Sequence, residues 1–211
     1  MRKATRIVAA LFGAFAGFGG PEHGYFEILR GNARPDSLII AAMGPPCDPE
    51  KVWNLCEPAM TVIPSYLATG ILAFVIGLIT MVWAAAFVHR KHGGLILILL
   101  SIALLLVGGG LFPPVIGIVA GLVATRINAP LTKQPSRLYG RVLRFLARLW
   151  PWPLVAFFVW AFGQFIVGYF FNELLQQSGF LAPLLIVGLL VLSILTGHAY
   201  DVHDRDRVSV K

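Results

Sequence analysis

The amino-acid sequence predicts an all-α, polytopic helical membrane protein with a single transmembrane domain over residues 1–211. Hydrophobic residues make up 57% of the chain and charged residues only 13%, whereas about a quarter of the residues in soluble domains are charged. No formal charge occurs between Glu57 and His89, and about 20 apolar residues suffice to cross a bilayer. A helix in water needs a polar face, which this stretch lacks.

Six apolar runs are predicted as membrane-spanning helices. The third and fourth meet at GGGLFPP, where glycines weaken a helix and prolines end or begin one. A single helix through this point would be about 45 Å long, against a hydrocarbon core of about 30 Å. We therefore expect two helices here. The predicted spans are 5–27, 62–88, 94–111, 113–127, 151–171 and 180–198.

The distribution of basic residues predicts how the chain threads the membrane. With six spans, most of the 17 Lys and Arg residues fall on one side, which the positive-inside rule assigns to the cytoplasm. A single long helix in the middle would move the basic residues between 126 and 148 to the other side. We expect both termini inside, in a multi-pass protein of the plasma or inner membrane. The chain has a net charge of +7, and its basic residues next to the spans are expected to face anionic headgroups. No soluble domain is left that could bind nucleic acid.

The first apolar run has two interpretations. The charged start MRKATR and the small residues around Ala16 fit a cleaved signal peptide, which would leave five helices and an outer N-terminus. Alternatively the run is a retained helix that continues through residues 25–29, with Gly13 and Gly17 packed closely on a neighbour. The six-helix prediction retains it, and an intact mass lacking the first sixteen residues would contradict that.

The predicted outer loop, residues 30–61, contains both cysteines of the chain, Cys47 and Cys56. In an oxidising compartment these two residues are expected to form a structural disulfide. A redox-active pair and two free thiols are the alternatives, although the spacing is not the C-x-x-C pattern that lowers a thiol pKa.

Residues 128–150 are predicted as a basic amphipathic segment on the cytoplasmic side. Arginines recur there at helical spacing, with apolar residues between them. We expect an interfacial helix on anionic headgroups, and a specific lipid-phosphate or partner site is the alternative. The arginines are Arg137, Arg141, Arg144 and Arg148.

Histidines lie near the predicted cytoplasmic ends of the second and sixth spans. The sixth span is followed by a predicted cytoplasmic tail at 199–211. Imidazole and carboxylate groups together are a weak pattern for a divalent metal. They lie on separate elements, so we predict no metal and no cofactor. The histidines are His89, His92, His198 and His203, with Asp201 and Asp204 nearby.

Polar residues near the outer ends of the helices form the predicted functional site. Ionisable groups at membrane depth are costly and usually face a bundle interior or a wet cavity. Histidine also titrates near physiological pH, which suits a cation or proton site. The alternative is an interfacial anchor at the end of the first helix. The predicted site residues are Glu22, His23, Gln164, Asn172 and Glu173.

No catalytic signature is present: G-x-S-x-G, H-E-x-x-H, a Walker loop and a dinucleotide fingerprint are all missing. The leading hypothesis is a transporter or channel-like protein for a small solute or ion, self-associating through glycine-rich helix faces. One alternative is a non-catalytic membrane subunit that docks a partner through the outer loop. Another is a membrane-embedded enzyme or redox component.

Overall fold

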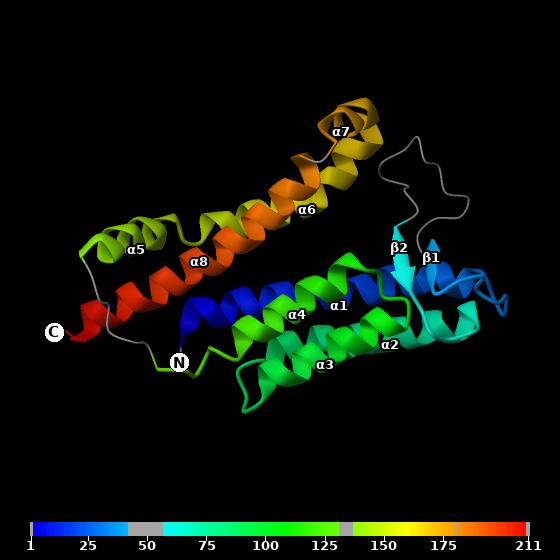
Figure 1. The fold of residues 1–211 in the computed structure, drawn as a ribbon, viewed down its shortest axis with the longest axis horizontal. Coiled ribbons are helices and arrows are strands. Elements are labelled where there is room, and N and C mark those ends of the chain that lie inside the picture. The colour runs from blue at the N-terminus through cyan, green and yellow to red at the C-terminus, as the bar shows by residue number, and fades with distance from the viewer. Residues whose placement is uncertain (1, 42–56, 131–136, 180, 210–211) are drawn as a thin grey trace. The chain divides into compact units, whose positions relative to one another are not determined.

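The structure is a computed structural model that describes residues 2–41, 57–130, 137–179 and 181–209. It is mostly helical, as expected, with one small two-stranded sheet (Figure 1). The chain divides into two compact units. The α1–α4 unit comprises described residues within 9–125, and the α5–α8 unit comprises residues 2–8 together with the described part of 126–209.

In the α1–α4 unit, α1 (Lys3–Leu29) packs closely against α2 (Tyr66–Val82). A Cβ added at Gly17 would lie 2.6 Å from the Met81 backbone nitrogen, and one at Gly24 would lie 2.5 Å from the Gly70 carbonyl oxygen. The order of these contacts makes the two helices antiparallel. Glycine permits this approach because it has no Cβ, so the expectation of close packing around Gly17 is confirmed.

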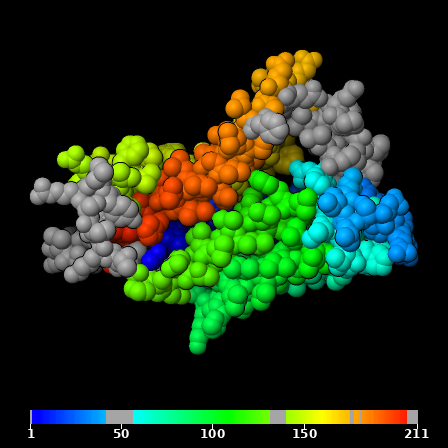
Figure 2. All heavy atoms as spheres, viewed as in Figure 1, coloured from blue at the N-terminus to red at the C-terminus, as the bar shows by residue number. Residues whose placement is uncertain are grey.

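The stretch predicted as two helices is indeed two, α3 (Gly93–Leu106) and α4 (Phe112–Ala124). They form an antiparallel pair in which a Cβ at Gly94 would lie 2.5 Å from the Gly121 carbonyl oxygen. Pro113 and Pro114 stand in the first turn of α4, where a missing N–H costs nothing. In the space-filling view the side chains of the two helices form one continuous green surface (Figure 2).

Two short strands, β1 (Ile39–Ala41) and β2 (Pro58–Met60), pair antiparallel in the same unit. The loop between α3 and α4 lies along β2, where the Gly108 N–H donates to the Met60 carbonyl at 2.8 Å. The Leu111 N–H donates to the Pro58 carbonyl at 3.1 Å. The sheet therefore holds the glycine loop in place.

The α5–α8 unit consists of α5 (Arg137–Leu149), α6 (Trp152–Phe170), α7 (Asn172–Ser178) and α8 (Leu181–Ser209). Both α5 and α6 pack along α8 (Figure 1). Leu143 and Ala147 of α5 are buried against Ala199 of α8.

The structure corrects the predicted number of membrane spans. Among the described helices, three are long and apolar enough to cross a membrane, not six: Tyr66–Phe87, Trp152–Phe170 and Leu181–Arg205. The first combines α2 with a short π-helix, Trp83–Phe87. At 14 and 13 residues, α3 and α4 extend only about 20 Å. The apolar stretch of α1 is followed by Pro21, Glu22 and His23 within the same helix.

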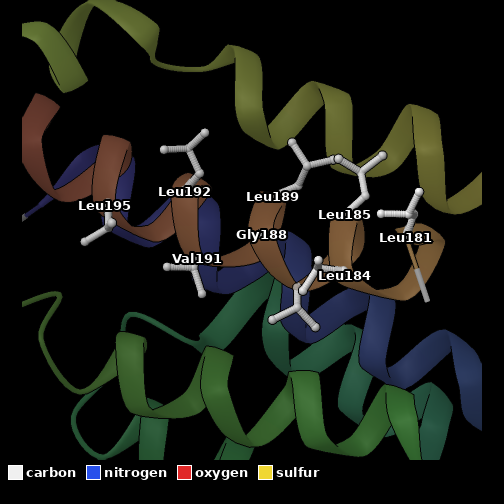
Figure 3. Close-up of a pocket in the computed structure, with 9 residues that line it drawn as sticks. Leu181, Leu184, Leu185, Gly188, Leu189, Val191, Leu192 and Leu195 are labelled. Atoms are coloured by element: carbon white, nitrogen blue, oxygen red, sulfur yellow. The ribbon is translucent and has the colours of Figure 1, made fainter.

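The C-terminal helix also differs from its predicted bounds. The span predicted to end at 198 continues as α8 through Ser209, so most of the predicted tail 199–211 is helical. Further toward its start, α8 presents an open apolar face of leucine and valine side chains (Figure 3). A Cβ added at Gly188 on this face would have no described atom within 4 Å. An open apolar surface of this kind is what a lipid-facing helix presents.

Candidate functional site

Two ionisable side chains of α1, His23 and Glu27, are buried in the α1–α4 unit. Each has an exposed fraction of 0%. They are four residues apart on one helix and therefore share a face. Neither carboxylate oxygen of Glu27 receives a hydrogen bond from the described residues. A buried carboxylate without donors costs several kcal/mol, so this group is the most unusual polar feature of the unit.

The glycine loop between α3 and α4 covers both side chains. Gly108 has a φ of +90°, and a Cβ placed there would lie 2.6 Å from Glu27 Oε2. Gly110 has a φ of +84°, and a Cβ there would lie 2.9 Å from His23 Nε2. Side chains other than glycine rarely adopt these φ values. The loop backbone therefore comes directly against the carboxylate and the imidazole because no Cβ intervenes.

A pair of buried threonines fixes the start of this loop. The Thr61 and Thr69 hydroxyl oxygens lie 2.6 Å apart. The Thr69 hydroxyl donates to the Val107 carbonyl at 2.7 Å. This carbonyl precedes Gly108, so the two threonines and the strand β2 together hold the loop over Glu27.

The hydrogen bond of His23 orients its imidazole. Nδ1 lies 2.9 Å from the Gly19 carbonyl oxygen, and because that oxygen can only accept, Nδ1 carries a proton. Nε2 lies 3.5 Å from Glu57 Oε2. The Glu57 side chain is 46% exposed, so His23 stands between a carboxylate that reaches the surface and the buried interior.

The structure divides the predicted site residues between the two units. Glu22 is half-buried beside His23 and is close enough to Glu57 for their like charges to interact. Gln164 on α6 is half-buried, and Glu173 at the start of α7 is exposed. Gln164, Asn172 and Glu173 all belong to the α5–α8 unit, so their grouping with Glu22 and His23 stays a prediction.

Glu27 was missing from the predicted site, although it is the most deeply buried carboxylate in the α1–α4 unit. A signal for it exists in the sequence, because Glu27 follows His23 by four residues on a helix expected to continue that far. The signal for the covering loop was the run Gly108-Gly109-Gly110. Only the fold brings these two segments together.

A second buried carboxylate, Asp201 of α8, binds the beginning of α1 within the α5–α8 unit. Its Oδ1 accepts from the Ala4 N–H at 2.9 Å. Its Oδ2 accepts from the Thr5 N–H at 2.8 Å and from the Thr5 hydroxyl at 2.7 Å. The first N–H groups of a helix have no partner within it, so Asp201 caps α1 from a distant helix. Asp201 is 7% exposed, so this part of the predicted tail is buried.

Arg2 completes the contacts around this cap. Its guanidinium donates to the carbonyl oxygens of Ala129 and Pro130 at 3.2 and 3.0 Å and lies 3.4 Å from His198 Nδ1. Burial lowers the pKa of Arg2 from its ordinary value, whereas the Asp201 charge opposes that shift. An arginine remains charged under such shifts, so Arg2 here acts as a fixed donor.

The remaining predicted sites have mixed outcomes. Among the described residues, no three His, Cys, Asp or Glu side chains lie close enough together to hold a metal ion, and this includes the histidines at the helix ends. Arg141, Arg144 and Arg148 are exposed on α5, whereas nothing is described of the Arg137 side chain. Cys47 and Cys56 lie outside the described residues, so their disulfide stays a prediction.

The fold and composition define a mostly helical protein with helices able to cross a membrane. No family model, curated protein or solved structure matches this chain.

Proposed function

We propose that this protein is a small integral membrane protein that binds and moves a cation, in the simplest case a proton, through a site centred on Glu27 and His23. The observation that carries the proposal is the buried Glu27 carboxyl, which has no hydrogen-bond donor among the described residues. Ionisable groups buried in membrane proteins typically serve ion or proton pathways. A proton or a small cation would supply the partner that Glu27 lacks.

The surroundings of Glu27 support a connection to the surface. Glu57 is partly exposed, and its carboxylate lies 3.5 Å from His23 Nε2. A proton received at Nε2 makes the imidazole a cation with two donors. Glu27 lies one helical turn farther along the same face of α1, so we propose that the cation passes from Glu57 by way of His23 toward Glu27. Glu22 adds a further carboxyl group beside His23.

Transport by the reconstituted protein tests this function. The protein is placed in liposomes that contain a pH-sensitive dye, and flux is driven by a potassium diffusion potential. We expect Glu27→Gln to reduce proton flux by at least about tenfold, because the amide side chain of glutamine does not take up a proton near neutral pH. His23→Ala should reduce flux as well, since it interrupts this path.

Asp36→Asn is the matched control, because it removes one carboxylate from an exposed residue of the same unit. It should leave flux unchanged. Equal flux through wild-type and Glu27→Gln proteins contradicts the proposal, as does wild-type protein that moves protons, Na⁺ and K⁺ no faster than empty liposomes.

A further inference from the structure

The helix α5 has one face buried against α8 and one face exposed. Leu143 and Ala147 are each 6% exposed and pack against Ala199 of α8. Arg141, Arg144 and Arg148 lie outside this contact and are exposed. Packing against α8 therefore fixes the rotation of α5 about its axis and turns these arginines away from α8.

The exposed face of α5 also carries large apolar side chains. Phe145 is 61% exposed and Val142 is 51% exposed. At 3.6 residues per turn, Phe145 is the neighbour of both Arg141 and Arg148 on the helix surface. The face thus combines guanidinium groups with an aromatic ring and an aliphatic side chain. A helix that faces only water gains nothing by exposing them.

No acidic residue occurs within α5, so its arginines have no carboxylate partner on their own helix. A row of exposed arginines on a helix without acidic residues attracts anions. The guanidinium group in particular binds phosphate through two parallel hydrogen bonds. Together with the neighbouring phenylalanine, this chemistry fits a phosphate attached to an apolar chain better than it fits a free phosphate.

The position of α5 in the chain places it at a membrane boundary. It ends at Leu149, and α6, one of the three helices suited to crossing a membrane, begins at Trp152. Trp152 is 69% exposed, and tryptophan favours the headgroup level of a bilayer. A helix that ends three residues before such a span reaches the headgroups by continuity of the chain.

We propose that the exposed face of α5 binds the headgroups of anionic phospholipids. Arg141, Arg144 and Arg148 contact the phosphates, while Phe145 and Val142 insert among the upper parts of the acyl chains. This inference is independent of the cation site, because it rests on α5 and α8 alone.

Native mass spectrometry of the full-length protein tests the headgroup contact. Bound phosphatidylglycerol and phosphatidylcholine are counted for the wild type and for the triple variant Arg141→Gln, Arg144→Gln, Arg148→Gln. Each arginine near an anionic surface strengthens binding about fivefold, so the variant should lose at least about tenfold in phosphatidylglycerol affinity. Phosphatidylcholine binding should change little.

A variant with three exposed basic residues replaced elsewhere, Arg34→Gln, Arg90→Gln and Lys91→Gln, controls for net charge. It should retain most phosphatidylglycerol binding. Equal losses in both variants contradict a site on α5. Displacement of the lipid by millimolar inorganic phosphate would show a site for free anions and overturn the lipid assignment.

Photocrosslinking tests the insertion directly. A photoreactive phenylalanine analogue is placed at position 145 or, as the buried control, at position 143. We expect phospholipid adducts from position 145 and adducts within the chain from position 143. Adducts between two copies of the protein from position 145 would identify a second copy as the occupant and overturn the proposal.

Discussion

Glu27 and Asp201 are both buried carboxylates, but their surroundings are opposite. Asp201 accepts three hydrogen bonds from Ala4 and Thr5, whereas Glu27 accepts none from the described residues. Charge-assisted hydrogen bonds of the kind around Asp201 contribute about 1.5–3 kcal/mol each. Glu27 instead lies beneath backbone that has no N–H directed at it. The two groups therefore have different expected roles.

Burial alone therefore does not define a functional carboxylate. Asp201 satisfies the otherwise unpaired N–H groups at the beginning of α1, which accounts for its burial through stability. Glu27 has the charge of Arg30 nearby but no described hydrogen-bond donor, so its burial points to a ligand or a proton. Substitutions at each site, and at the loop that covers Glu27, test this distinction.

The largest effect is expected for Gly108→Ala, which tests how tightly the loop covers Glu27. The new Cβ would meet the carboxylate at 2.6 Å from Oε2, in a backbone with φ of +90°. Strain and overpacking together should cost about 3 kcal/mol of unfolding free energy. The measurement is unfolding in mixed micelles with increasing dodecyl sulfate.

Gly31→Ala separates strain from overpacking, because Gly31 has a φ of +64° but no atom within 4 Å of an added Cβ. It should cost only about 1 kcal/mol. Equal losses at both positions would show that the loop does not press on Glu27.

An intermediate effect is expected for Asp201→Asn. The amide accepts through one oxygen only, so in either orientation its NH2 group faces a donor, either the Ala4 N–H or the Thr5 N–H and hydroxyl. We expect a loss of about 2 kcal/mol in unfolding free energy, measured in the same micelles. The exposed Asp204 provides the control Asp204→Asn, which should change stability by less than about half a kcal/mol. No loss at Asp201 would remove its assignment as a structural cap.

The smallest loss of stability is expected for Glu27→Gln. Because the carboxylate has no described donor to lose and a neutral amide removes a buried charge, the substitution should not lower the unfolding free energy by more than about 1 kcal/mol. A loss as large as that of Asp201→Asn would show that Glu27 is a structural group after all, and the contrast between the two carboxylates would disappear.

Much of the local structure was predictable from the sequence. The run GGGLFPP was expected to separate two helices, and the structure ends α3 at Leu106 and begins α4 at Phe112. The close packing of Gly17 was expected from its spacing to Gly13, since glycine allows helix backbones to approach. These features depend on the conformational preferences of a few consecutive residues, which a sequence displays directly.

The site was only partly predictable. His23 was expected in it, but Glu27 was not, and the bilayer-spanning length expected for α3 and α4 was wrong. Helix length was overestimated there because apolar residues continue into turns, such as Val107 and Leu111 beside the glycine loop. Hydropathy does not distinguish an apolar turn from an apolar helix.

The helical, membrane-suited class of this protein can be predicted from the sequence alone, because composition and periodicity reflect the solvent around each segment. Which of the two buried carboxylates finds hydrogen-bond donors depends on the tertiary fold. Asp201 finds its donors at Ala4 and Thr5, nearly the whole chain away, and Glu27 meets the backbone of Gly108 instead. The partners of a buried charge come from whichever distant segment folds against it, and no local pattern encodes that choice.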